Sequence, residues 1–425
     1  TLKAKKNDCF ALDVYVYDTK NVENTKLTIN AGNYVGNVSA VYAFTGKVTI
    51  NGGHFSIQQL SSSNDYRFML NCYDASYTAG TAGFTVNGGT FVKFDPSDSA
   101  SENPHANFLA EGYGVKRDDD NYIVTEPVAA IGNTKYPTLA AAITAAEAGG
   151  TVTLLKDIEG CSSLRPAVGS VVTIDLNDHN IKFNQNQSFS VVGSTLNLIG
   201  KGTVEESKPY YSPVMMYGGE NAENYSVLNV GENVTLKGWS AVFIDNTTGG
   251  KNSGIVANIN GHLFGLKDTS GDTGPGVYVN GNIKEQTYAP KITMGATSTI
   301  EATGTGMYLA GYAETVVENG AQIAGDITGI EIRAGKLTVN GGVITGNGVP
   351  TSVTPNGNGT TSNGVGIAVA QHTTKQNLVV KILGGEINGY SALYESNPQS
   401  NSDDDIAKVT MDVADGKFKA INGGT

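Results

Sequence analysis

Aromatic side chains recur at the outward positions of short strands in the second half of the chain. Each strand has Gly or Ala followed by an apolar–x–apolar triplet, and alternation along a strand turns its central residue away from the core. The central residues of successive triplets are Met215, Phe243, Tyr278, Tyr308, Glu331, Ala368 and Tyr394. An exposed row of rings can stack against the faces of sugars. The sequence therefore predicts a glycan-binding stripe with the ligand-binding residues Phe243, Tyr278, Tyr308, Glu331, Arg333 and Tyr394.

Three other interpretations of this stripe stay open. Long loops cover the rings, the rings stack on one another as a stabilising ladder, or the stripe contacts another protein. Tyr15 and Tyr42 are expected at equivalent outward positions in the first part of the chain. A row of outward rings is thus compatible with binding, with stability and with assembly.

Acid–base chemistry on glycosidic bonds needs paired carboxylates, and the outward triplet positions offer one, Glu331. Arg333 follows two residues later on the same face, so the sequence predicts an exposed ion pair that contributes little to stability. The five histidines are scattered, without the spacing of metal ligands. The acidic runs at 118–120 and 403–405 lack the alternating ligands of a calcium loop. We predict no catalytic residues, no metal and no cofactor.

Repeats of one short motif position these residues. Residues 336–346 read as an alternating strand, an Asn-Gly-Gly corner and a second strand, and close copies lie at 48–55, 84–91 and 380–387. Self-similarity of this kind predicts short strands stacked coil upon coil. The corner Asn side chains are expected to form hydrogen-bonded ladders. Asn and Gly also tolerate the left-handed backbone that a tight corner requires.

Residues 1–127 are predicted to form a first array of coils. Its strands include 13–17, and Cys72 is expected in the core as a small hydrophobic residue. A hairpin with arms at 108–113 and 121–124 is expected to cap the last coil, because a solenoid otherwise exposes its final rung.

Residues 128–425 are predicted to form a second array. It begins with an alanine-rich capping helix at about 138–148, with Thr138 as the N-cap and a Gly-Gly pair as its end. The triplets follow at irregular spacings, which predicts loops of different lengths leaving a common coil.

Composition excludes some classes of function. The net charge of −12 opposes binding to nucleic acid, whose phosphates need a basic face. No apolar run approaches the roughly 18 residues of a membrane-spanning helix. The chain starts without Met and ends within a repeat, so we expect a mature or trimmed product whose array continues beyond the sequence given.

The short strands, the Gly/Asn corners, the capping helix and residues 172–177 resemble the right-handed parallel β-helix of the pectate-lyase-like superfamily. The Asn-Gly-Gly strands and residues 131–143 also resemble uncharacterised surface proteins of gut Bacteroidetes-type bacteria. The resemblance implies an all-β fold, a right-handed parallel β-helix solenoid with two consecutive arrays and one short capping helix. It also implies an exported, non-catalytic, adhesin-like protein at the cell surface that binds a polysaccharide or host glycan.

Two other functions stay open. Enzymes of the superfamily are polysaccharide lyases or glycoside hydrolases, and their carboxylate clusters and Gly-His-Gly motif are missing here. The nearest approach, residues 261–263, does not match. A phage tail-fibre segment or other structural role is the third possibility, and such a segment is expected to trimerise along its axis.

Overall fold

The computed structural model describes residues 1–5, 9–16, 25–59, 65–184, 188–219, 224–247, 254–285, 287–352 and 360–424. The chain forms two compact units, residues 1–142 and 143–425. The domain boundary predicted at 127/128 stays a prediction. Tyr17, at the end of a predicted strand, lies outside the described residues.

The first unit is built from three sheets, to which successive coils contribute one strand each. The largest has the order β1 (Leu2–Lys3), β4 (Asn33–Gly36), β7 (His54–Ile57), β10 (Thr90–Val92), β12 (Asn121–Thr125) and β11 (Gly114–Asp118). The other two are β2 (Phe10–Val14), β5 (Ser39–Ala43) and β8 (Leu70–Cys72), and β3 (Lys26–Ile29), β6 (Gly46–Ile50) and β9 (Ala82–Val86). Pairing is parallel except around β12. The connections include a 3-10 turn, η2 (Asp65–Phe68), and a short helix, α1 (Asp74–Thr78).

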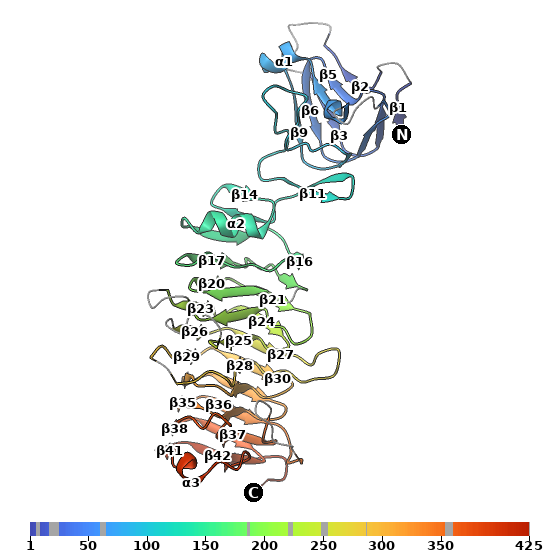
Figure 1. Ribbon diagram of the computed structural model, residues 1–425. Helices are drawn as coiled ribbons and strands as arrows, with labels where there is room; N and C mark the ends of the chain where they lie inside the picture. The colour runs from blue at the N-terminus through green and yellow to red at the C-terminus, as the bar shows by residue number, and fades with distance from the viewer. Residues whose placement is uncertain are drawn as a thin grey trace. The chain divides into compact units, whose positions relative to one another are not determined.

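The second unit has three long parallel sheets (Figure 1). The first sheet includes β15 (Thr151–Leu154), β17 (Val171–Asp175), β20 (Thr195–Ile199), β23 (Ser226–Val230), β26 (Ile255–Ile259), β29 (Lys291–Met294), β32 (Glu314–Val317), β35 (Gly335–Val339), β38 (Leu378–Ile382) and β41 (Val409–Val413). The second has the order β16 (Ile158–Cys161), β18 (Ile181–Phe183), β21 (Gly202–Glu206), β24 (Val234–Gly238), β27 (His262–Gly265), β30 (Thr299–Ala302), β33 (Gln322–Gly325), β36 (Val343–Gly346), β39 (Glu386–Gly389) and β42 (Lys417–Ala420). The third sheet has the order β19 (Phe189–Val192), β22 (Val214–Tyr217), β25 (Val242–Asp245), β28 (Val277–Val279), β31 (Met307–Leu309), β34 (Ile330–Ile332), β37 (Val365–Ala370) and β40 (Ser391–Ser396).

The strands stack in register, as the repeats predict. In the third sheet Val277 pairs with Val242 on one side and Met307 on the other, and all three side chains are fully buried. Each inward position therefore packs against its equivalents in the coils before and after it. Burial is shared along the axis rather than gathered at one centre. The prediction of an all-β parallel β-helix is confirmed.

The capping helix predicted at about 138–148 forms at nearly the predicted place. The helix α2 (Leu139–Ala146) begins after Thr138, whose hydroxyl oxygen accepts a hydrogen bond from the Ala141 amide at 3.2 Å. It follows an antiparallel hairpin of β13 (Ala129–Ile131) and β14 (Thr134–Tyr136). A further short helix, α3 (Asp403–Ile406), lies near the end of the second unit.

The hairpin β11–β12 forms as predicted, but its first arm lies later than expected. The apolar segment at 108–110 was assigned to that arm. Phe108 is instead buried in the core of the first unit, and its carbonyl accepts a hydrogen bond from the Val86 amide at 2.7 Å. The segment at 108–110 therefore pairs with an earlier coil instead of joining the hairpin, and the first hairpin arm begins at Gly114. Cys72 is buried, as predicted.

The Asn-Gly-Gly corners form the predicted ladder in the first unit. The Asn51 side-chain amide donates to the Asn30 side-chain oxygen at 2.8 Å, and Asn87 donates to Asn51 at 2.9 Å. Of the two glycines in the third corner, Gly89 has a φ of 111°, which is unfavourable for other residues. Gly88 has a different role, because a Cβ there would lie 2.3 Å from the Asn51 carbonyl oxygen in the coil below.

We predict that Gly88→Ala lowers the free energy of unfolding by about 1–3 kcal/mol, since the added methyl forces two stacked coils apart. Urea denaturation followed by circular dichroism measures the loss. Gly83→Ala is the control in the same unit, because its Cβ would meet only the flexible end of Lys47 at 3.2 Å. Equal losses in the two variants would contradict the steric explanation.

Candidate functional site

The third sheet of the second unit brings three of the predicted aromatic residues into one column. Phe243 pairs with Tyr278, and Tyr278 pairs with Tyr308. The ring centroids of Phe243 and Tyr278 are 5.3 Å apart at 11°, and those of Tyr278 and Tyr308 are 5.5 Å apart at 30°. Strands about 4.8 Å apart place equivalent rings at stacking distance. The rings therefore stabilise one another, which was one of the interpretations left open.

The prediction of an exposed ion pair at Glu331 and Arg333 is wrong. Both side chains have 0% exposure, and Tyr308 beside them has 5%. The reason is a covering segment from the long β36–β37 connection. The Thr361 hydroxyl and the Ser362 hydroxyl donate to the Glu331 carboxylate at 2.7 and 3.3 Å, and the Thr361 amide donates to it at 3.0 Å.

Arg333 joins this carboxylate to the aromatic column. Its Nη1 donates to the Tyr308 hydroxyl at 3.0 Å, and its Nε lies 3.9 Å from Glu331 Oε1. Burial raises the pKa of Glu331, against the opposing effects of the Thr361 hydrogen bonds and the Arg333 charge. Burial also raises the pKa of Tyr308 well above its usual range. The un-ionised Tyr308 side chain thus contacts a polar network whose two charged members, Glu331 and Arg333, are fully buried.

Tyr308 also lines a pocket of about 180 Å³. Two of its lining residues, Tyr278 and Tyr308, belong to the predicted stripe. The other six are not predicted from the sequence: Trp239, Thr273, Pro275, Gly304, Thr305 and Thr360. The Trp239 ring lies 5.9 Å from that of Tyr278, at 55°. Trp239 is the only tryptophan in the chain, and Ser240 and Ala241 separate it from β25. Its rarity was the one signal in the sequence that could have found it.

Two polar atoms at this pocket have no hydrogen-bond partner among the described residues. They are the indole Nε1 of Trp239 and the hydroxyl Oγ1 of Thr305, a residue with 3% exposure. A buried polar group without a partner costs free energy. Both atoms are buried, and the residues that carry them line the pocket beside the stacked Tyr278 and Tyr308 rings. The described lining holds no Asp, Glu, Lys, Arg or His, so this pocket suits an uncharged ligand with hydroxyl groups.

The remaining predicted residue lies apart from this pocket. Tyr394 is in the same column, but Glu331 and Ala368 separate it from the rings, and it has 49% exposure. In the first unit, the half-buried Tyr42 stacks on Phe10 at 4.4 Å, whereas Tyr15 is exposed.

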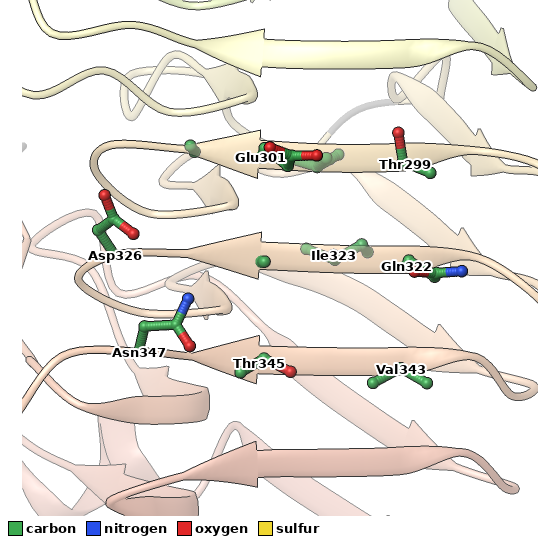
Figure 2. Close-up of a pocket in the computed structure, with 11 residues that line it drawn as sticks. Thr299, Glu301, Gln322, Ile323, Asp326, Val343, Thr345 and Asn347 are labelled. Atoms are coloured by element: carbon green, nitrogen blue, oxygen red, sulfur yellow. The ribbon is translucent and has the colours of Figure 1, made fainter. Parts of the chain in front are cut away.

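A second hollow, of about 400 Å³, lies on β30, β33 and β36 of the second sheet (Figure 2). Glu301 projects from β30, and Asp326 and Asn347 follow the ends of β33 and β36. The column position between Glu301 and Thr345 holds Ala324, whose small side chain leaves the space open. This hollow is polar and its acidic side chains are exposed, unlike the aromatic pocket.

Neither a metal-binding cluster nor a membrane-spanning helix is found among the described residues. No group of three or more His, Cys, Asp or Glu side chains in them could hold a metal ion. No helix in the described ranges combines the length and apolar character needed to cross a membrane.

Comparison with known proteins identifies no relative: no family model, no curated protein and no solved structure matches this chain.

Proposed function

We propose that this chain is a non-catalytic carbohydrate-binding β-helix protein of a bacterial cell surface, and that the Trp239 pocket holds one neutral sugar ring. The observation that carries the proposal is a pocket with no charged residue in its described lining that contains the half-buried Trp239 and Tyr278 rings. Sugars offer hydroxyl groups at their edges and C–H faces above and below the ring. A ligand of this chemistry would pack its C–H face against the half-buried Trp239 and Tyr278 rings.

The size of the pocket is in keeping with a small ligand such as one sugar ring. Its volume is about 180 Å³. Sites for drug-sized ligands are larger, roughly 300–1,000 Å³. The cell-surface location rests on the resemblance to surface proteins of gut bacteria. The acidic net charge of −12 favours solubility, as an exported protein requires.

We predict that Trp239→Ala weakens glycan binding at least about tenfold, because tryptophan rings that line pockets are typical binding hot spots. A glycan array with the native chain selects the ligand. Isothermal titration with that ligand then compares native chain, Trp239→Ala and Thr305→Val. Tyr394→Ala is the matched control, since that ring is exposed and outside the pocket.

Native affinity in the Trp239→Ala variant would contradict the proposal. So would equal losses in Trp239→Ala and Tyr394→Ala, because binding would then follow the outward column rather than the pocket.

One observation favours a second candidate function, a glycoside hydrolase. Glu301 and Asp326 line the same open hollow on the second sheet, and hydrolysis of glycosidic bonds uses two carboxyl groups flanking the sugar. In that case the native chain releases reducing ends from a panel of polysaccharides, and Glu301→Gln and Asp326→Asn each abolish the release. Unchanged release in both variants would exclude this pair.

A further inference from the structure

We infer that the Trp239 pocket is one part of a longer site, in which Tyr210 forms a second stacking platform for the next sugar of a neutral oligosaccharide. This inference rests on the proposed function and names its ligand class as a chain of two or more neutral sugar units.

The first support is position. The Tyr210 ring lies 5.7 Å from the Trp239 ring at 57°, and Trp239 lies 5.9 Å from Tyr278. Trp239 thus stands between the pocket rings on one side and Tyr210 on the other. Tyr210 has 53% exposure, so its ring is available to a ligand that continues past Trp239.

The second support is that this exposed ring is held in place. The Tyr210 hydroxyl donates to Asp272 Oδ2 at 2.5 Å and lies 3.1 Å from the Ser270 hydroxyl. Tyr210 also has a φ of 65°, a backbone conformation that residues other than glycine rarely adopt. An exposed aromatic side chain normally loses rotamer freedom when a ligand binds. Here that freedom is restricted beforehand, which favours affinity.

The third support is that one loop forms both the platform's anchor and the pocket wall. The Asp268 carboxylate accepts hydrogen bonds from the Ser270 and Asp272 amides at 2.8 and 2.9 Å, which shapes the β27–β28 loop. The same loop supplies Thr273 and Pro275 to the pocket lining. Tyr210, from the β21–β22 connection, is therefore fixed to the loop that borders the pocket.

Charges of both signs lie near the platform, so the ligand class follows from the pocket. Asp268 and Asp272 hold and shape the platform, and hydrogen bonds from Ser270 hold the pKa of Asp268 below its usual value. Lys208 and Lys267 lie in the same two segments. The described lining of the adjoining pocket holds no charged residue, which favours neutral sugars.

The test compares single sugars with the matching disaccharides: glucose with cellobiose, galactose with lactose, and N-acetylglucosamine with chitobiose. Quenching of Trp239 fluorescence reports binding, because this is the only tryptophan and it lines the pocket. We expect the native chain to bind one disaccharide about tenfold or more tightly than its monosaccharide. Tyr210→Ala lowers the disaccharide affinity more than the monosaccharide affinity and so removes this advantage, whereas Tyr210→Phe, which keeps the ring, loses less.

Equal losses for monosaccharide and disaccharide in Tyr210→Ala would overturn the second platform, as would no loss for either. The proposed function fails in a different way, when native fluorescence responds to none of the pairs, and that result overturns both. Circular dichroism of each variant checks that the fold is retained.

Discussion

Arg333→Met is expected to lower the free energy of unfolding by about 3–5 kcal/mol. Arg333 and Glu331 are both fully buried, so removal of the guanidinium leaves the Glu331 carboxylate without its cation. The Tyr308 hydroxyl loses its hydrogen bond from Arg333 at the same time. Urea denaturation followed by Trp239 fluorescence measures the loss in the unit that contains these residues.

The loss in Arg333→Met should depend on pH. Burial raises the pKa of Glu331 above the ordinary 4.5, and removal of Arg333 raises it further. A carboxyl group with a raised folded-state pKa contributes its full stability below the unfolded-state value and loses it as the pH rises through the folded-state value. The destabilisation should therefore be larger at about pH 8 than at about pH 5.

Two further variants separate this explanation from a simple packing defect. Adding Glu331→Gln to Arg333→Met removes the unpaired charge and should restore part of the stability. Lys336→Met breaks the exposed Lys336–Glu314 pair, at 2.7 Å, and should cost below about 1 kcal/mol. Glu331→Gln alone is measured as well. If the loss in the double variant equals the sum of the losses in Arg333→Met and Glu331→Gln, the unpaired charge is not the cause.

Phe55→Ala is expected to lower the free energy of unfolding of the first unit by about 3–5 kcal/mol. Phe55 is fully buried between Tyr34 and Phe91, with ring centroids 5.1 and 4.8 Å away and interplanar angles of 12° and 9°. These residues occupy equivalent positions in β4, β7 and β10. One substitution therefore removes two stacked contacts and leaves a cavity in a continuous ladder.

Circular dichroism during urea denaturation measures the effect of Phe55→Ala. Tyr15→Ala is the control, because that ring is exposed and its loss should fall within the usual small range of surface changes, about 0.5 kcal/mol. Similar losses in the two variants would show that the ladder contributes no more than surface contacts.

The aromatic pocket shows how far sequence reasoning reached for the site. Alternation within each triplet placed Tyr278 and Tyr308 in one outward column, and both line the pocket. Trp239 and Thr305 lie outside the triplets, so periodicity gave no reason to select them. Both line the pocket because the folded chain brings them next to Tyr278 and Tyr308. A linear pattern does not contain that information.

Repeated Asn-Gly-Gly corners and apolar alternation were enough to predict parallel strands stacked in register, because each coil repeats the same short-range geometry. The alanine run and the Thr138 cap likewise predicted the helix that forms at 139–146. These local patterns did not predict which outward residues meet solvent. Glu331 is buried because Thr361, thirty positions later, folds over it. Alternation is a property of neighbouring residues, whereas cover comes from loops distant in the chain.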